Sequence, residues 1–364
     1  MFQGVYGKRR VLVTGFSGFK GTCLSFFLRR LGAELFGVAL PMPEPSLWKI
    51  SGGERFLRGE YCDIRNLEKL EKIFAEFRPE IVFHLAAQSL VRKSYEDPLE
   101  TFSSNVMGTV NVLECCRHCE SVRAAVVVSS DKCYENRETI VPYTEKDPLG
   151  GHDPYSASKG CTEIVAASYR KSFFPPEKYG ISHQLLLASC RAGNVIGGGD
   201  YAPDRLVPDL VRGALAGTET ILRNPDSVRP WQHVWEPLSG YLALGAKLFS
   251  GEKEFASCWN FGPESACVIP VREASFLLGK SWDRIHVKEC RNEEAPHEAK
   301  LLLLDSTKAR TLLHWKNVWD AEKTFQATAR WYRAFHEEGV NLLEEQLEEY
   351  IRDAKEQNLE WSKP

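Results

Sequence analysis

A glycine-rich turn near the N-terminus is the feature that most constrains the fold of this chain. Residues 10–14 (RVLVT) form a β-type run, and Gly15, Gly18 and Gly21 follow with the spacing G-x-x-G-x-x-G at the start of a helical pattern. Glycines here let the backbone approach a pyrophosphate, and the helix N-terminus offers free N–H groups and a partial positive charge. A glycine-rich turn alone can be only a tight turn, but its place at the start of a βαβ unit predicts a dinucleotide site.

Alternating strand and helix signals over the first 190 residues predict an α/β protein with a Rossmann-like, doubly wound parallel sheet. The expected strands cover residues 10–14, 34–39, 54–63, 81–85, 124–128 and 181–190. The expected helices cover residues 21–31, 66–77, 98–119, 154–169, 205–216, 234–248 and 342–357. The alternation weakens after residue 190, so we expect a dinucleotide-binding domain at 1–190 and a smaller, mostly helical substrate-binding region at 191–364, with some interleaving.

Composition excludes several other classes of protein. The 364 residues are 43% hydrophobic with a formal net charge of −3. The chain has no long basic run, which argues against nucleic acid as its main partner. No apolar segment approaches the ~18 residues of a membrane span, and the N-terminus lacks a signal-peptide pattern. The eleven cysteines, an odd number, fit reduced thiols. We therefore expect a cytoplasmic protein.

Four potential metal ligands lie close together in the sequence. Cys115, Cys116, His118 and Cys119 fall inside a helical pattern with no second ligand pair at finger spacing. Plain helix packing is the favoured interpretation, and we expect no metal.

The expected second strand does not end in the carboxylate that usually holds the ribose of NAD. Leu40 and Met42 stand there instead. Asp63, after the next expected strand, has two possible roles: accepting a hydrogen bond from an adenine amino group, or capping the helix that begins near Asn66. Asn105 is polar in an apolar helix, which more often indicates a bridge to backbone or water than a catalytic group.

Residues 129–159 are predicted to form an active site. Ser130, Asp131 and Lys132 follow a buried apolar run, and the carboxyl ends of parallel strands face the ligand crevice. Tyr155 and Lys159 share one helix face, one turn apart. We expect the Lys159 ammonium to lower the pKa of the Tyr155 phenol and make it a base near neutral pH.

Six segments carry a resemblance to a known family: TGFSGFKG, HLAAQS, SSDKCY, DPYSASK, RAGNVIGGGD and RPWQHVWEPLSGYL. Together they resemble the extended short-chain dehydrogenase/reductase superfamily of nucleotide-sugar enzymes, over residues 11 to about 314. The resemblance is narrower still, to the CDP-glucose 4,6-dehydratase family. Three features carry it: the Phe19-Lys20 pair in the glycine turn, the Asp131-Lys132 pair, and the segment RPWQHV.

This resemblance implies an NAD-dependent lyase that converts CDP-glucose to its 4-dehydro-6-deoxy derivative by oxidation at C4, loss of water across C5–C6 and hydride return to C6. Tyr155, Lys159 and Ser130 would serve the oxidation. Asp131 would be the acid for the 6-hydroxyl and Lys132 the base for the C5 proton, where related dehydratases carry Glu. A charged Lys132 could only stabilise the enolate.

The resemblance also implies which residues surround the ligands. The implied cofactor-binding residues are Gly15, Phe16, Ser17, Gly18, Phe19, Lys20, Gly21, Asp63, Ile64, Leu85, Ala86, Ala87, Asn105, Ser129, Tyr155 and Lys159. The implied substrate-binding residues are Ser89 and Arg92 near the sugar, Asn194 and Arg205 along the nucleotide, and Arg229 and His297 near the diphosphate. Trp231 and Trp235 stack on a base or pack in the core, and packing is favoured.

The resemblance further implies a homodimer or a dimer of dimers, formed through the helices at 98–119 and 154–169. Two other functions remain open: a nucleotide-sugar epimerase of the same superfamily, and a non-catalytic NAD(P)-binding regulator. The Asp131–Lys132 pair argues against the first. The presence of both Tyr155 and Lys159 argues against the second.

Overall fold

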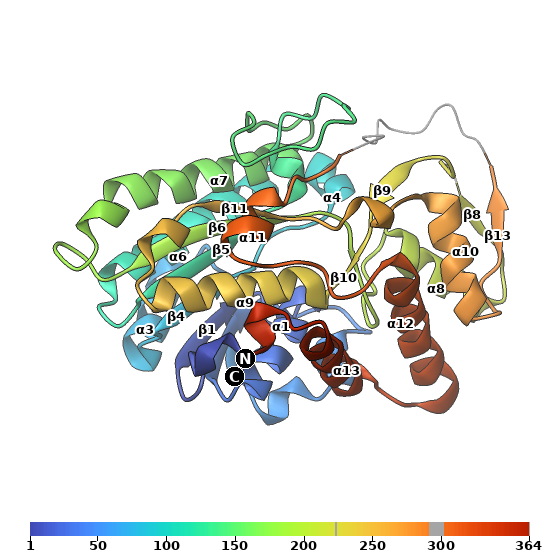
Figure 1. Ribbon diagram of the computed structural model, residues 1–364, viewed down its shortest axis with the longest axis horizontal. Coiled ribbons are helices and arrows are strands. Elements are labelled where there is room, and N and C mark those ends of the chain that lie inside the picture. The colour runs from blue at the N-terminus through green and yellow to red at the C-terminus, as the bar shows by residue number, and fades with distance from the viewer. Residues whose placement is uncertain (223, 291–301, 364) are drawn as a thin grey trace.

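A parallel sheet of seven strands forms the centre of the protein, whose computed structural model describes residues 1–222, 224–290 and 302–363 (Figure 1). The strand order β11-β6-β5-β4-β1-β2-β3 is that of a Rossmann-like fold, so the predicted fold class is confirmed. The strands are β1 (Arg10–Thr14), β2 (Glu34–Ala39), β3 (Arg58–Tyr61), β4 (Ile81–His84), β5 (Ala124–Val128), β6 (Leu186–Ala192) and β11 (Cys258–Phe261). The order reverses between β1 and β4, which places a ligand crevice at their carboxyl ends.

Helices cover both faces of this sheet. One layer consists of α1 (Phe19–Arg30), α9 (Trp235–Phe249) and α13 (Leu343–Glu356). The other consists of α3 (Leu67–Phe77), α5 (Pro98–Phe102), α6 (Gly108–His118) and α7 (Pro154–Ser172). Successive side chains of β1 point to opposite layers: Val11 and Val13 join one core cluster and Leu12 joins the other. Burial on both sides explains why β1, β4 and β5 read as continuous apolar runs.

A smaller region lies to the right of the sheet in Figure 1. It holds three pairs of short strands: β7 (Val195–Ile196) with β10 (Gln232–His233), β8 (Thr220–Leu222) with β13 (Val287–Glu289), and β9 (Val228–Pro230) with β12 (Val268–Pro270). Its helices are α8 (Leu206–Ala216), α10 (Val271–Ser281) and α12 (Ala321–Arg333). Three short helices connect the main elements: α2 (Leu47–Ile50), α4 (Val91–Glu96) and α11 (Thr307–Leu312).

The chain crosses between the two regions more than once. After residue 190 it builds β7 and α8, then returns to the main sheet with α9 and β11, where β11 pairs with β6. The C-terminal segment also returns, so both termini lie side by side in Figure 1 and the rings of Phe2 and Trp361 stack at 5.3 Å.

Two expected elements are placed differently in the structure. The strand expected at 54–63 is wrong in its first half, because Gly53–Arg55 forms a 3-10 turn and β3 begins only at Arg58. A Cβ on Gly53 would lie 2.2 Å from the Trp48 ring, so the backbone there packs against α2 instead of extending along the sheet. The strand expected at 181–190 begins at Leu186 and continues to Ala192.

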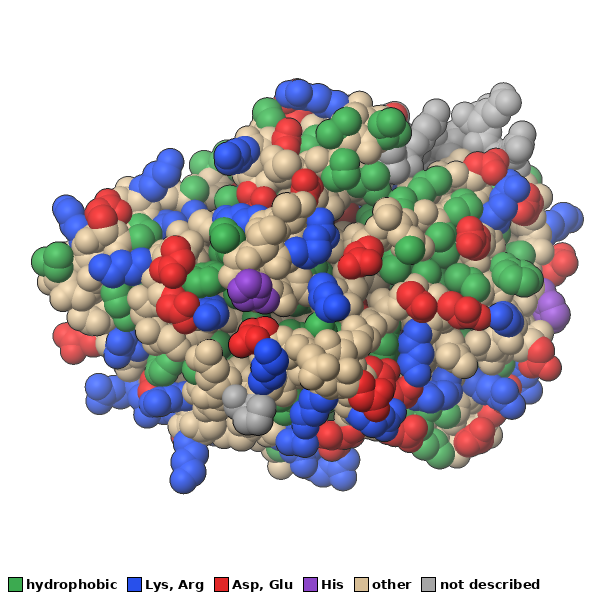
Figure 2. Space-filling model, in the orientation of Figure 1, with side chains coloured by type: hydrophobic (Ala, Val, Ile, Leu, Met, Phe, Trp, Pro, Cys, Tyr) green, Lys and Arg blue, Asp and Glu red, His purple; other side chains and the backbone are tan. Residues whose placement is uncertain are grey.

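Charges of both signs alternate over the face shown in Figure 2, without a large basic patch. Within the described residues, no helix has the length and apolarity needed to cross a membrane. Nor does any group of three or more His, Cys, Asp or Glu side chains in those ranges form a candidate metal site.

Candidate active site

The glycine turn joins β1 to α1 with very little room. Gly15 has φ +77°, and a Cβ on it would lie 2.8 Å from the amide nitrogen of Ala86. A Cβ on Gly21 would lie 1.9 Å from the carbonyl oxygen of Gly15. Gly18, the N-cap of α1, offers no side-chain acceptor to the first N–H groups of the helix. The turn thus leaves backbone donors at a helix N-terminus, the arrangement that binds a pyrophosphate.

A threonine that the sequence analysis did not single out supports the strand end opposite this turn. Thr14 Oγ1 accepts hydrogen bonds from the backbone N–H of Leu85 (3.1 Å) and Ala86 (3.2 Å). It also contacts His84 Nδ1 at 2.7 Å. Burial lowers the pKa of His84 to about 3, so this imidazole is neutral. The Leu85–Ala87 segment is therefore fixed close to the glycine turn.

Asp63 does not cap α3. The helix is capped by Asn66, whose side chain accepts from Lys69 N at 3.0 Å, so the capping alternative for Asp63 is wrong. Both Asp63 oxygens are held by the Arg65 guanidinium at 2.6–3.0 Å, and this hydrogen bonding lowers the pKa of the Asp63 carboxyl.

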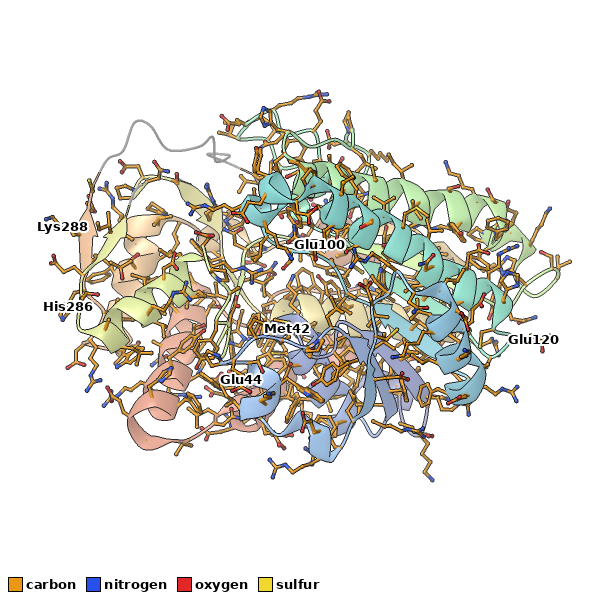
Figure 3. The ribbon with its side chains drawn as sticks, turned by 180° about the vertical axis from the view of Figure 1, so that it is seen from behind. Met42, Glu44, Glu100, Glu120, His286 and Lys288 are labelled. Atoms are coloured by element: carbon orange, nitrogen blue, oxygen red, sulfur yellow. The ribbon has the colours of Figure 1, made fainter. Side chains whose placement is uncertain are left out.

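Leu40 and Met42 after β2 are exposed. Figure 3 places Met42 and Glu44 in the segment that follows β2, with Glu120 and His286 at opposite ends of the molecule.

Asn105 lies in a π-helical turn, Ser103–Met107, between α5 and α6. Its Oδ1 accepts from Gln88 N at 2.8 Å, and its Nδ2 donates to Gln88 O at 2.9 Å and to Ser158 Oγ at 2.8 Å. The side chain thus bridges the segment after β4 to helix α7, which is the bridging role that its apolar surroundings indicated.

The predicted trio stands at the carboxyl end of β5. Ser130 caps a 3-10 turn, η4 (Asp131–Cys133), by accepting from Lys132 N at 3.2 Å, and it donates to Asp131 Oδ1 at 2.9 Å. Asp131 is buried, whereas the Lys132 side chain is 36% exposed with its Nζ 4.0 Å from Asp131 Oδ1. A carboxyl group and an amine of contrasting environment therefore lie next to one hydroxyl.

Helix α7 brings Tyr155 and Lys159 to the same place. Asp153 caps it by accepting from Ser156 N at 2.9 Å, and Pro154 occupies the first turn, where its missing N–H costs nothing. Tyr155 and Lys159 are both buried, and Lys159 Nζ donates to the Val128 carbonyl at 3.3 Å. The trio and the Tyr–Lys pair, separated by more than twenty residues of sequence, thus form one cluster.

The expected direction of the Tyr155 pKa shift is wrong for this cluster. Burial raises the pKa of the phenol, and the groups that oppose this most are Ser130 through a hydrogen bond and Lys132 through its charge, rather than Lys159. Burial lowers the pKa of Lys159 to about 8, with Glu163 acting in the opposite direction. The spacing placed the two side chains on one helix face correctly, but it could not show how completely both are removed from water.

Lys20 also faces this cluster from the start of α1. Burial, together with the nearby charge of Arg205, lowers the pKa of Lys20 to about 8, while Asp131 and Asp200 act to raise it. The glycine turn and the Ser130–Lys132 trio are therefore electrostatic neighbours.

The residues expected around a substrate are distributed over both regions. Arg92 on α4 pairs with Asp204 at 2.6 Å, and Arg205 pairs with Asp200 at 2.7 Å. Arg229 lies on strand β9 and donates to the Val228 carbonyl at 3.0 Å. The other three are Ser89, which is exposed, Asn194, which is half-buried, and His297, which lies outside the described residues.

Trp231 and Trp235 are core residues, as the packing interpretation expected. Trp231 is buried against the Phe325 ring at 5.7 Å, and Trp235 is 1% exposed.

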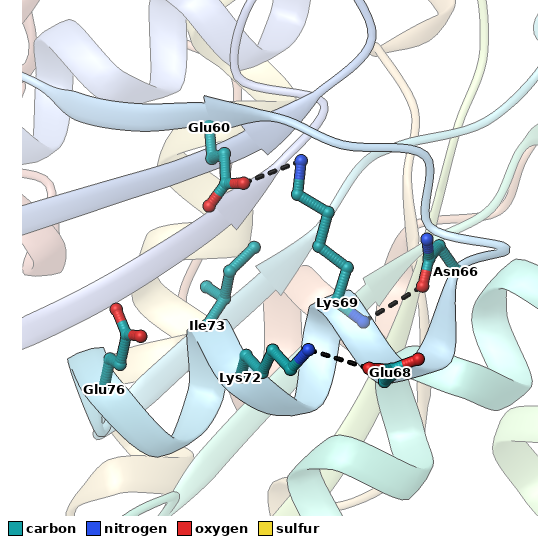
Figure 4. Close-up of a pocket in the computed structure, with 7 residues that line it drawn as sticks. All are labelled: Glu60, Asn66, Glu68, Lys69, Lys72, Ile73 and Glu76. Carbon is teal, nitrogen blue, oxygen red and sulfur yellow. Dashed lines mark hydrogen bonds and ion pairs between the residues drawn. The ribbon is translucent and has the colours of Figure 1, made fainter.

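Two surface cavities lie outside the cluster. One, of about 410 Å³, lies between β3 and α3 and is lined by charged side chains that pair with one another, such as Glu60 with Lys69 and Glu68 with Lys72 (Figure 4). The other, of about 390 Å³, is bordered by Pro142, Pro230 and Arg310 in the smaller region. Neither includes Tyr155 or Lys159.

A buried ion pair that the sequence analysis missed lies directly behind the cluster. Glu163 on α7 accepts from Arg191 on β6 at 2.8 Å, with both side chains at most 3% exposed. Glu163 lies four residues after Lys159, so the spacing that singled out the Tyr–Lys pair could also have indicated this residue.

These residues fit a bound dinucleotide. The backbone of the glycine turn packs directly against the strand ends, and α1 begins there with no side-chain cap on its first N–H groups. The Lys159 ammonium and the Ser130 and Tyr155 hydroxyls provide donors at the far end of β5. Such a site, at the switch point of a parallel sheet, is the arrangement of the dinucleotide-dependent enzymes.

The chain belongs to the GDP-mannose 4,6 dehydratase family, whose model matches residues 12–328. Among characterised relatives, CDP-glucose 4,6-dehydratase of Salmonella typhimurium is 46% identical over 331 residues, which cover 90% of this chain and 91% of that protein. The resemblance read from the six sequence segments is therefore confirmed.

Solved structures agree with the fold. A dTDP-glucose 4,6-dehydratase from Streptomyces venezuelae, solved with NAD bound, has a TM-score of 0.73 at 26% identity, covering 89% of this chain and 97% of that chain. A UDP-glucose 4-epimerase from Thermotoga maritima has a TM-score of 0.74 at 23% identity, covering 89% of this chain and 98% of that one.

Proposed function

We propose that this protein is an NAD-dependent nucleotide-sugar 4,6-dehydratase that acts on CDP-glucose and forms CDP-4-dehydro-6-deoxyglucose. The observation that carries the proposal is the position of the Asp131–Lys132 pair, 4.0 Å between Oδ1 and Nζ, beside the Ser130–Tyr155 hydroxyls. An oxidoreductase needs only the hydroxyls and Lys159. A dehydratase also needs an acid and a base for the loss of water, and this pair supplies both chemical types.

The first step requires a base at the sugar's 4-hydroxyl. Tyr155 takes that proton, and Ser130 donates a hydrogen bond to the same oxygen as charge develops on it. Lys159 is proposed to hold the nicotinamide ribose, and the Ser130 hydrogen bond is the largest influence that lowers the Tyr155 pKa against the effect of burial. Bound NAD would supply the acceptor for hydride from C4 and the donor of that hydride to C6. The glycine turn, Asp63 and the Leu85–Ala87 segment are the remaining groups proposed to hold NAD.

The second step removes water. The C5 proton of glucose is not acidic until C4 is a ketone. Lys132, whose side chain reaches solvent, then removes the C5 proton, and the buried Asp131 protonates the departing 6-hydroxyl.

The diphosphate and nucleotide are assigned to the cationic side chains of the smaller region. Asn194 and Arg205 are assigned to the nucleotide, Arg229 to the diphosphate, and Ser89 and Arg92 to the sugar. A planar guanidinium can hold phosphate oxygens bidentately. Arg205 and Arg92 are paired with Asp200 and Asp204 in this structure, so a bound diphosphate shares or replaces those carboxylates.

We further propose a homodimer in the cytoplasm. The outer surface of the α5–α6 and α7 layer carries the exposed apolar side chains Phe102, Met107 and Ile164, which a second copy would cover. All eleven cysteines are free thiols, which suits a reducing compartment.

The substrate is tested with purified protein and a panel of CDP-glucose, dTDP-glucose, UDP-glucose and GDP-mannose, with no added reductant. We expect a 4-keto-6-deoxy sugar, detected by its absorbance in alkali, from CDP-glucose at a rate well above the others. A different preferred nucleotide would refute the substrate assignment, and a C4 epimer as product would refute the dehydratase assignment in favour of the epimerase alternative.

A further inference from the structure

A buried carboxylate, Glu163, connects helix α7 to the two strands that carry the site. It is 2% exposed and accepts hydrogen bonds from Ser129 Oγ on the segment after β5, from Ser189 Oγ on β6 at 2.7 Å, and from Arg191 on β6 at 2.8 Å. A buried carboxylate with three hydrogen-bond donors is firmly fixed.

These contacts act on the same short piece of backbone as Lys159. Lys159 Nζ donates to the Val128 carbonyl, and Glu163, one helical turn later, accepts from the next residue, Ser129. Two consecutive turns of α7 are thus attached to two consecutive residues of the strand end that leads into Ser130. The distance of Lys159 and Tyr155 from the Ser130–Lys132 trio depends on this double attachment.

Arg191 extends this hydrogen-bond network beyond Glu163. It donates to Tyr134 Oη at 2.5 Å, and that hydroxyl donates to Asn260 Oδ1 on β11 at 2.8 Å. The guanidinium also lies over the Tyr134 ring at 4.8 Å. Glu163 and Arg191 therefore sit in a polar network that joins α7, β6, β11 and the segment after η4.

The titratable groups around Lys159 come from α7 itself and from three other elements. Glu163 and Tyr155 share α7 with it, Cys133 faces it from η4, His84 from β4 and Lys20 from α1. His84 is neutral and Lys20 is cationic, and burial lowers the pKa of Lys159 to about 8. Of the two side chains that act to raise the Lys159 pKa, Glu163 and Cys133, only Glu163 is a carboxylate, and Arg191 neutralises part of its charge.

We propose that Glu163, held by Arg191, is a positioning residue that keeps the Lys159 ammonium charged and places it beside Tyr155 for the cofactor. This inference rests on the proposed function only in taking NAD as the ligand of Lys159. It assigns to the ion pair a role in cofactor binding beyond packing α7 on the sheet.

The test measures the dissociation constant of NAD, by quenching of tryptophan fluorescence, from neutral to alkaline pH. In the wild-type protein the affinity falls as Lys159 loses its proton. Glu163→Gln removes the anion and leaves Arg191 as an unpaired cation, so the midpoint of this fall moves to lower pH by about one unit. Glu163→Gln/Arg191→Met removes both charges, and its midpoint lies between the other two.

Glu349→Gln is the matched control, because Glu349 is also buried and held by two cations, Lys323 and Arg330, but lies on α13. Its midpoint stays at the wild-type value even though its thermal stability falls. If Glu163→Gln alone does not fold, the double variant, which leaves no unpaired buried charge, gives the result.

Equal midpoints in wild type and in the folded Glu163 variants would overturn the proposal and leave a packing role. A wild-type affinity that does not change with pH would overturn it as well. Because no sugar is present, a protein that binds NAD but does not convert CDP-glucose refutes the proposed function and leaves this test intact.

Discussion

Replacing Lys132 by Arg separates the two roles that its position allows. Arg keeps a positive charge near Tyr155 and Asp131 but does not lose its proton in proteins, so it cannot act as a base. Loss of a positioned base slows a proton transfer by about 10²–10⁴-fold, or about 3–5 kcal/mol. Loss of the charge alone has a smaller effect, because the Lys132 side chain is 36% exposed at 4.0 Å from Asp131 Oδ1. Such a pair contributes about 1 kcal/mol at most, roughly fivefold in rate.

We therefore expect Lys132→Arg to oxidise C4 at nearly the wild-type rate and to stall at the elimination. Rapid mixing with CDP-glucose would show the absorbance of reduced nicotinamide rising and persisting, while keto-deoxysugar forms about 10²–10⁴-fold more slowly. Lys132→Ala behaves in the same way with a slower first step, and Lys146→Arg, at an exposed lysine, serves as the control. Full turnover by Lys132→Arg would show that only a charge is needed and that the base lies elsewhere.

Three further outcomes follow from the geometry. Gly21→Ala should lower stability by about 1–3 kcal/mol, because its Cβ would lie 1.9 Å from the Gly15 carbonyl oxygen. Gly18→Ala, whose Cβ would lie 3.4 Å from the same oxygen, should keep the wild-type melting temperature, and equal melting temperatures in the two variants would contradict this. Tyr155→Phe should reduce turnover by about 10²–10⁴-fold with an unchanged circular dichroism spectrum, and residual activity near wild type would exclude Tyr155 as the base. Burial lowers the pKa of His84 to about 3, against 6.5 for the free group, so the stability that its neutral form contributes is complete above pH 6.5. As the pH falls from 6.5 towards 3, the free energy of unfolding should decrease by about 1 kcal/mol per pH unit. Urea unfolding of His84→Gln should show a smaller decrease, and an unchanged decrease would refute this.

Local sequence patterns predicted the elements that carry the site. The runs at 10–14 and 124–128 coincide with β1 and β5, since strands buried on both faces are continuous apolar runs bounded by clear turn signals. The edge strand β3 was misplaced because its residues, Arg58–Tyr61, are mostly exposed and carry no apolar pattern. An edge strand is defined by the neighbour it pairs with, and no local signal shows that neighbour.

The sequence could not show which side chains become buried, or which distant segments of the chain return to the main sheet. The attachment of β11 to β6 depends on a segment about seventy residues further along the chain, and no spacing rule connects the two. The Tyr155 pKa is raised because burial outweighs the nearby charges, and burial is a property of the assembled fold. Glu163 showed only as one polar residue in a helix until Arg191 was placed against it.

The most direct test of the central claim follows one atom through the reaction. CDP-glucose carrying deuterium at C4 is incubated with the purified protein, and the product is examined by NMR. We predict a 4-keto-6-deoxy sugar with the deuterium at C6, because the dehydratase removes it from C4 and returns it within the same active site. Deuterium retained at C4, in unchanged sugar or in a C4 epimer, would contradict the proposed function.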